Sequence, residues 1–211
     1  MKRNRIYFVD EDAAARRANV RGLISLLDNP EIQVIAQEPL HAMADYNELL
    51  AKPDTAAFIL DQRMKGGGIG YNGTDLASHL RGIDGKMPIY ILTGHSRERQ
   101  DFAGCEHLVE NIIGKEDIED ANSEEAKTVK ARMLRHLDVF NDVRNDRESR
   151  FHDLLVKSLR EALTPEEQTE MDRLEGEATA AVLAEERAKE QNLARAVETV
   201  KGLIRAGNLP L

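Results

Sequence analysis

The sequence predicts an α/β fold, a doubly wound sheet of five parallel strands followed by long α-helices. Five short apolar runs of strand length occur within about the first 120 residues, and the segments between them carry apolar residues three and four positions apart, as helices do. After that point strand-like runs nearly vanish, and Ala, Glu, Arg and Leu dominate. Strands that alternate with helices imply parallel pairing and a sheet covered on both faces.

The predicted strands are the five apolar runs. They cover residues 5–9, 32–36, 56–60, 87–92 and 108–113. Most are continuously apolar and do not alternate, which is typical of parallel strands buried on both faces. Helical spacing follows the first two strands, at Leu23, Leu26 and Leu27 and at Leu49 and Leu50. Five such units fill the length of a small doubly wound domain, so we expect one domain over residues 1–120.

The second region, residues 121–211, is expected to be a helical extension. Val129, Met133, Leu137 and Phe140 lie three or four positions apart and form one apolar stripe. In "TPEE", residues 164–167, the threonine suits an N-cap, the proline the first helical position and the glutamate a capping box. We therefore predict helices at about 123–163 and 165–206. If the first helix is interrupted, we expect the interruption around the polar "NDRESR", residues 145–150.

Composition and charge exclude several classes of protein. The 29 Lys and Arg residues face 38 Asp and Glu residues, and no basic stripe occurs, so nucleic acid is not expected as a partner. No run of 18 apolar residues is present, and the first residues do not resemble a signal peptide. We therefore expect a cytoplasmic protein without a membrane partner. The single Cys105 excludes an intrachain disulfide framework and a cysteine-based zinc site.

A glycine-rich segment follows the third predicted strand. Gly68 to Gly73 matches the spacing G-x-G-x-x-G of dinucleotide-binding loops. Six residues separate Asp61 from Gly68, and the unit contains the third strand instead of the first, so the segment does not meet the mechanical requirements of that loop. A phosphate-binding P-loop would need a lysine before Ser or Thr, which is absent. We interpret the segment as a surface loop.

Polar residues end most of the predicted strands. In an open parallel sheet the carboxyl ends of the strands form the ligand-binding edge, so these side chains are expected to converge. Clustered carboxylates repel one another, and a hard divalent cation such as Mg²⁺ relieves that repulsion. A carboxylate nucleophile, a lysine and a hydroxyl suit phosphoryl transfer. The residues in question are Asp10, Glu11, Asp12, Asp61, Thr93 and Lys115.

Five stretches carry a family resemblance: "IYFVDEDAAARR", "FILDQRM", "GTDLASHLR", "MPIYILTGHS" and "NIIGKED". Through them residues 5–119 resemble a response-regulator receiver domain, the phospho-accepting module of two-component signalling. The resemblance implies a flavodoxin-like strand order, 2-1-3-4-5. It also implies a histidine kinase or phosphotransfer protein as the phosphodonor. The helices are expected to form an antiparallel hairpin or a coiled-coil dimer. They would then act in homodimerisation or partner binding, or the protein would be a phosphate sink.

The resemblance also assigns roles to particular residues. Asp61 would be the phospho-acceptor, Thr93 the switch hydroxyl and Lys115 the phosphate-contacting lysine. Mg²⁺ would be held by Asp10, Glu11, Asp61 and the backbone carbonyl of Arg63.

The chain departs from the family pattern at three places. The loop after Met64 is longer than usual and carries Lys65 where proline is common. Glu116 replaces the usual proline after the lysine, and Ile112 stands where many members have an aromatic switch residue. The acceptor chemistry is therefore expected to be intact, while the way in which phosphorylation is propagated stays open.

Two alternatives remain. A haloacid-dehalogenase-like phosphohydrolase would use Asp10 and Asp12 as nucleophile and acid/base, but it leaves Asp61 without a role. A degenerate receiver that serves as a helical scaffold would not respond to phosphorylation. We interpret His152 as an exposed helical residue and not as a phosphorylation site, and Cys105 as a packing residue.

Overall fold

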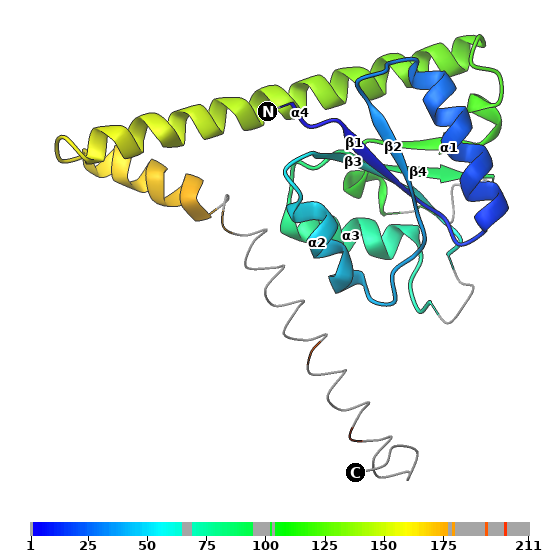
Figure 1. Ribbon diagram of the computed structural model, residues 1–211, viewed down its shortest axis with the longest axis horizontal. Coiled ribbons are helices and arrows are strands. Elements are labelled where there is room, and N and C mark those ends of the chain that lie inside the picture. The colour runs from blue at the N-terminus through cyan, green and yellow to red at the C-terminus, as the bar shows by residue number, and fades with distance from the viewer. Residues whose placement is uncertain are drawn as a thin grey trace.

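A computed structural model of the chain describes residues 2–64, 69–94, 102, 104–176, 179, 193 and 201. Five strands form one parallel sheet in the order β2-β1-β3-β4-β5, which confirms the predicted fold class (Figure 1). They are β1 (Arg5–Val9), β2 (Gln33–Gln37), β3 (Thr55–Asp61), β4 (Ile89–Thr93) and β5 (Asn111–Gly114). Strand bounds differ from the prediction by no more than two residues, except that β5 begins three residues later than expected.

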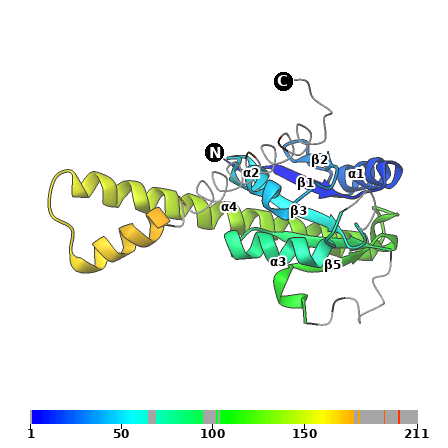
Figure 2. The same cartoon turned by 90° about the horizontal axis from the view of Figure 1, so that it is seen from below.

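Helices cover both faces of the sheet (Figures 1 and 2). One face packs against α1 (Ala13–Leu27) and α4 (Glu124–Ser158), and the other against η1 (Met43–Tyr46), α2 (Asn47–Ala51) and α3 (Gly73–Ile83). Each face has its own apolar core. Side chains of one strand point alternately to the two faces. Ile6, Phe8 and Ile59 therefore pack in the first core, and Tyr7, Phe58 and Leu60 pack in the second.

The connection from β4 to β5 departs from the regular alternation of strand and helix. Its described residues are 94, 102 and 104–110, and among them residue 102 and the turn η3 (Glu106–Leu108) have 3-10 conformation, with no α-helix in the described part. The predicted fifth strand included Leu108, which instead belongs to this turn. Its carbonyl oxygen accepts hydrogen bonds from Arg81 at 3.0 and 3.2 Å, so it is unavailable for strand pairing.

The long helix α4 is continuous over 35 residues and ends at Ser158, five residues before the predicted end. The interruption expected within residues 145–150 does not occur. Arg150, inside that polar segment, forms an ion pair of 2.7 Å with Glu170 of the following helical segment. The polar side chains of the segment are therefore accommodated on the helix surface, and the helix continues through them. The first part of α4, from Ala126 to Leu137, belongs to the core that it shares with α1.

Beyond the sheet, α4 and the chain after it form an antiparallel hairpin (Figures 1 and 2). Residues 165–176 are helical, and the predicted capping box is present: Glu167 N–H donates to Thr164 Oγ1 at 3.2 Å, and Thr164 N–H donates to Glu167 Oε2 at 3.0 Å. Leu154 and Leu174 are buried, one in each arm. The remainder of the helix predicted to residue 206 lies outside the described residues. Because α4 belongs to both the core and the hairpin, the division of the chain near residue 120 stays a prediction.

Candidate functional site

Four of the predicted site residues lie at the carboxyl ends of neighbouring strands. Asp10 follows β1, Asp61 and Thr93 are the last residues of β3 and β4, and Lys115 follows β5. Because the strands are parallel, these positions share one edge of the sheet. Asp10, Asp61 and Thr93 are buried, and Lys115 is partly exposed. Their proximity therefore follows directly from the topology.

Lys115 links the two buried carboxylates. Its Nζ donates a hydrogen bond to Asp61 Oδ1 at 2.7 Å and lies 3.5 Å from Asp10 Oδ2. Burial alone would lower the pKa of Lys115, but the hydrogen bond and negative charge of Asp61, with the charge of Asp10, raise it overall. The lysine therefore stays charged and offsets the repulsion between the two acids.

Asp10 is the least satisfied member of this group. Its Oδ1 accepts the N–H of Asp12 at 2.9 Å, whereas its buried Oδ2 has no hydrogen-bond partner. Burial, and after it the negative charge of Asp61, raises the pKa of Asp10. A buried carboxylate oxygen that faces another carboxylate is a costly arrangement, and binding of a cation would relieve it.

Asp61 is oriented by its own backbone and by Lys115. Its Oδ2 accepts the N–H of Arg63 at 2.8 Å, while Oδ1 accepts from the lysine. The next element, α3, begins close by: Gly73 N–H donates to Gln62 O at 3.1 Å. A Cβ at Gly73 would lie only 2.5 Å from the carbonyl oxygen of Asp61, so glycine is required for this approach.

The end of β4 is tied to the start of the β5–α4 connection. The backbone N–H of Lys115 donates to the carbonyl oxygen of Thr93 at 2.9 Å. Lys115 then leads into the 3-10 turn η4 (Glu116–Ile118), and buried Ile118 packs in the core that includes the first part of α4. The site is therefore connected to α4 through a short segment that Ile118 anchors in the core.

The other two predicted metal ligands are less enclosed. Glu11 is exposed, and the side chain of Arg63, whose carbonyl was predicted as a ligand, is exposed as well. Among the described residues, no three His, Cys, Asp or Glu side chains form a group that could hold a metal ion. The donors at this edge are therefore the pair Asp10 and Asp61 together with backbone oxygens.

Asp12 has a structural role. It is the N-cap of α1, and its Oδ1 accepts the N–H groups of Ala14 at 2.7 Å and Ala15 at 2.9 Å. These two bonds, that of Ala15 first, lower the pKa of Asp12. A general acid near neutral pH needs a raised pKa, so the geometry disfavours the pairing of Asp10 and Asp12 as hydrolase residues.

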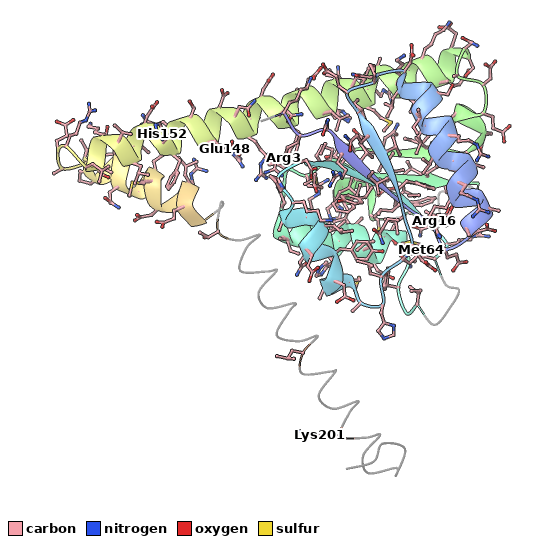
Figure 3. All side chains as sticks on the ribbon, in the orientation of Figure 1. Arg3, Arg16, Met64, Glu148, His152 and Lys201 are labelled. Atoms are coloured by element: carbon pink, nitrogen blue, oxygen red, sulfur yellow. The ribbon has the colours of Figure 1, made fainter. Side chains whose placement is uncertain are left out.

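The sequence analysis missed one residue at this edge, Arg16 of α1. Its Nη1 donates to the carbonyl oxygen of Asp10 and, at 3.4 Å, to that of Glu11. Arg16 lies at the same end of the molecule as Met64, which directly follows Arg63 (Figure 3). Arg16 is the fourth residue of α1, one turn after the N-cap, a position that by itself does not distinguish it from an arginine on the helix surface.

The remaining candidates are the glycine-rich segment, His152 and Cys105. Gly68 of the glycine-rich segment lies outside the described residues, and a Cβ added at Gly70 would meet no heavy atom within 4 Å. His152 is exposed on α4, and Cys105 is a half-buried free thiol.

No family model and no curated protein matches the chain. Several solved structures are similar to part of it. The response regulator TrrA of Thermotoga maritima, solved in complex with Mg²⁺-BeF, is 18% identical with a TM-score of 0.43, over 62% of this chain and 98% of its own. A LuxR-family two-component response regulator of Aurantimonas sp. is 20% identical with a TM-score of 0.45, over 81% and 96%. The signal receiver domain of an HD-domain protein of Pseudomonas fluorescens is 14% identical with a TM-score of 0.47, over 69% and 94%.

Proposed function

We propose that the chain is a phospho-accepting response-regulator protein of two-component signalling, with Asp61 as the acceptor. The observation that carries the proposal is the position of Lys115, whose ammonium lies 2.7 Å from Asp61 Oδ1 and 3.5 Å from Asp10 Oδ2 at the carboxyl edge of the sheet. A fixed cation between two buried carboxylates suits the handling of a phosphoryl group, which brings further negative charge to the same place.

The proposed reaction is the transfer of a phosphoryl group to a carboxylate. An oxygen of Asp61 forms a bond to phosphorus while the phosphorus–nitrogen bond of a phosphohistidine breaks, and the released imidazole nitrogen keeps the electron pair and takes a proton from solvent. The product is an acyl phosphate on Asp61. Lys115 offsets the negative charge on the transferred oxygens, and the hydroxyl of Thr93 donates a hydrogen bond to the product phosphate.

The donor set at this edge fits Mg²⁺. Oδ2 of buried Asp10 has no hydrogen-bond partner and only the Lys115 ammonium at 3.5 Å to offset its charge, so binding of a cation is favoured, and all the candidate ligands are oxygens. Glu11 does not form a metal-binding group with Asp10 and Asp61 in the described structure, so we propose that it joins Asp10, Asp61 and the backbone carbonyl of Arg63 only when the ion binds. When bound, it would supply positive charge that neutralises the transferring phosphoryl group.

The phosphodonor would be a histidine kinase or a phosphotransfer protein. We propose that the protein acts in the cytoplasm. None of the described helices is both long and apolar enough to span a membrane. With a net charge of −9 and no basic stripe, nucleic acid is not proposed as a partner.

The helical region is the proposed output. Lys115, η4 and the start of α4 are consecutive, and α4 continues unbroken into the hairpin. If Lys115 moves from Asp61 to a bound phosphoryl group, the base of α4 moves with it, which makes α4 a candidate two-state element. We therefore propose a receiver unit over residues 1–120 and an extension over 121–211 that dimerises or binds a partner. A phosphate sink is the alternative output.

Labelling by a small phosphodonor tests the acceptor. We expect the wild-type protein, incubated with Mg²⁺ and acetyl phosphate, to gain one phosphoryl group in intact-mass measurements. Asp61→Asn should gain none, whereas the matched control Asp28→Asn, at an exposed carboxylate after α1, should be labelled like the wild type. Labelling that persists in Asp61→Asn would refute the assignment of the acceptor.

The same samples distinguish the alternatives. A hydrolase that depends on Asp10 would turn over phosphodonor in Asp61→Asn, and a helical scaffold would remain unlabelled in every variant. Light scattering of labelled and unlabelled protein then tests the output: a change in mass supports phosphorylation-dependent assembly, and an unchanged mass supports partner binding or a phosphate sink.

A further inference from the structure

The loop between β1 and α1 is held from the helix side by Arg16. This residue lies on the first turn of α1, and its guanidinium reaches back to the loop that precedes the helix. Nη1 donates to the carbonyl oxygen of Asp10 and lies 3.4 Å from that of Glu11. One side chain therefore contacts the backbone of both residues of the acidic pair.

The same loop is fixed by two further sets of bonds. The N–H of Asp12 donates to Asp10 Oδ1 at 2.9 Å, and the Asp12 side chain caps α1. These bonds hold one oxygen of the Asp10 carboxylate and leave Oδ2 3.5 Å from Lys115. With the carbonyl of Asp10 bonded to Arg16, both the backbone and the carboxylate of this residue have a defined direction.

The hydrogen bonds from Arg16 to the β1–α1 loop counteract the repulsion between the two buried acids of the site. Asp10 and Asp61 are buried carboxylates that share one lysine, so repulsion between them favours movement of the loop away from Asp61 when no cation is bound. A charge-assisted hydrogen bond to the backbone opposes that movement. A site that is held open before its ligand arrives binds the ligand more tightly, because less ordering remains to be done.

We propose that Arg16 is a positioning residue that sets the backbone of Asp10 and Glu11 for binding of a divalent cation. The proposal rests on the proposed function in that it concerns the same site, but it predicts a binding property that can be measured without phosphorylation.

Calorimetric titration with Mg²⁺ alone is the direct test. We expect Arg16→Ala to raise the Kd for Mg²⁺ about tenfold, the effect of losing one charge-assisted hydrogen bond. Arg16→Lys keeps the charge but loses the forked donor, so its Kd should lie between those of the wild type and Arg16→Ala. Arg17→Ala is the matched control, because it removes the same charge from the next position of α1, where the side chain is exposed and has no described hydrogen bond.

A second readout separates positioning from general damage. The stabilisation that Mg²⁺ confers in thermal unfolding depends on its Kd, so Arg16→Ala should shift less than the wild type at the same Mg²⁺ concentration. In acetyl phosphate labelling, Arg16→Ala should need about ten times more Mg²⁺ for half-maximal rate and should regain the wild-type rate at saturation. If Arg16→Ala does not fold, the ranking of Arg16→Lys against Arg17→Ala decides the question.

The outcomes are distinct. If Arg16→Ala binds Mg²⁺ with the wild-type Kd, Arg16 does not position the loop and the proposal is overturned. If Arg17→Ala raises the Kd as much as Arg16→Ala does, the effect is only one of charge, and the proposal is overturned as well. A wild-type protein that binds no Mg²⁺ would also overturn it. If the wild type binds Mg²⁺ and depends on Arg16 but is never labelled, the inference stands and the proposed function fails.

Discussion

The ammonium of Lys115 lies 2.7 Å from Oδ1 of Asp61 and 3.5 Å from Oδ2 of Asp10, so one side chain balances two buried acids that come from different strands. The lysine is itself only partly buried, with 28% of its side chain exposed, so solvent can reach the group through its side of the site. The pKa values of Asp10 and Lys115 are both raised, and a change at either residue is expected to alter the pH dependence of stability.

Lys115→Ala is expected to lower stability most near neutral pH. Two carboxylates would then face each other without a cation, at a cost of roughly 3 kcal/mol for a broken buried pair. Because the pKa of Asp10 is already raised from 3.8, the penalty develops as pH rises above that value and is relieved when Asp10 is protonated at lower pH. Thermal unfolding of wild type and variant at a series of pH values between about 4 and 8 checks this.

The control for that experiment is Lys127→Ala, which removes a lysine from an ion pair with Glu124 in which the two side chains are 58% and 86% exposed. Its effect should be small at every pH, as for most surface pairs. In the wild type, the raised pKa of Lys115 means that the lysine is charged throughout the range below its ordinary value of 10.5, and its contribution is lost as pH rises through the folded-state pKa. At acidic pH the contribution falls for a different reason, because Asp10 becomes protonated. An effect of Lys115→Ala that is the same at acidic and neutral pH would contradict this role of Asp10.

Asp10→Asn is expected to stabilise the protein in the absence of a divalent cation. Since the folded-state pKa of Asp10 is raised, the folded protein binds more protons than the unfolded chain just above pH 3.8, and stability falls with pH until Asp10 is ionised. An amide carries no such penalty, so the Tm at neutral pH should rise by about 2–4 °C, the shift that corresponds to about 1 kcal/mol in a chain of this size.

The same variant should lose the rise in Tm that Mg²⁺ gives to the wild type, which links the strained carboxylate to function. Asp12→Asn is the control, because asparagine caps a helix as well as aspartate does and Asp12 is exposed. Differential scanning calorimetry with Mg²⁺ and with a chelator measures both effects. A Tm of Asp10→Asn below that of the wild type in chelator would show that the Asp10 carboxylate stabilises the fold instead.

The sheet, and the fact that the site residues lie close together at one of its edges, could be predicted from the sequence. Continuous apolar runs such as "AAFIL" indicate buried parallel strands, and parallel strands deliver the residues that follow them to one edge. Asp61 and Lys115 are 54 positions apart, yet their contact follows from strand order alone. The prediction that they cooperate in phosphoryl transfer goes further and stays a prediction.

The parts that could not be predicted depend on contacts between distant segments. Continuity of α4 through residues 145–150 is supported by Arg150 and Glu170, a pair that forms only once the hairpin has formed. The position of Arg16 is similar: "AAARRANV" fits an ordinary helix surface, and nothing in its spacing shows that the first arginine turns back to the loop while the second stays exposed.

Gly73→Ala should be strongly destabilising, although it lies in a helix. The added Cβ would meet two backbone atoms, Asp61 O at 2.5 Å and Gln62 Cα at 3.1 Å, and neither can move without shifting the end of β3. We expect a loss of about 1–3 kcal/mol, as for overpacking, together with slower labelling of Asp61. Gly82→Ala on the same helix has no atom within 4 Å and should gain about 0.5–1 kcal/mol. Urea unfolding measures both, and equal effects at the two glycines would refute the close approach.

Asn141→Ala tests how α4 is attached to the α/β unit. Asn141 is buried, and its side chain pairs with the backbone of Arg3: Oδ1 accepts the N–H at 2.7 Å, and Nδ2 donates to the carbonyl at 3.0 Å. Arg3 lies beneath the middle of α4, where the helix leaves the core (Figure 3). Alanine would leave both backbone groups without these partners, at a cost of about 1–3 kcal/mol.

The control is Asn145→Ala, one turn further along α4, where the side chain is exposed and the expected change is within about 0.5 kcal/mol. Hydrogen exchange of the Arg3 amide should accelerate in Asn141→Ala and stay unchanged in Asn145→Ala. Labelling of Asp61 should survive in both variants, because Asn141 lies at the opposite end of the sheet, near the start of β1. If α4 carries the output, any change in assembly on labelling should weaken in Asn141→Ala alone; an equal response in both variants would show that this attachment does not transmit the state of Asp61.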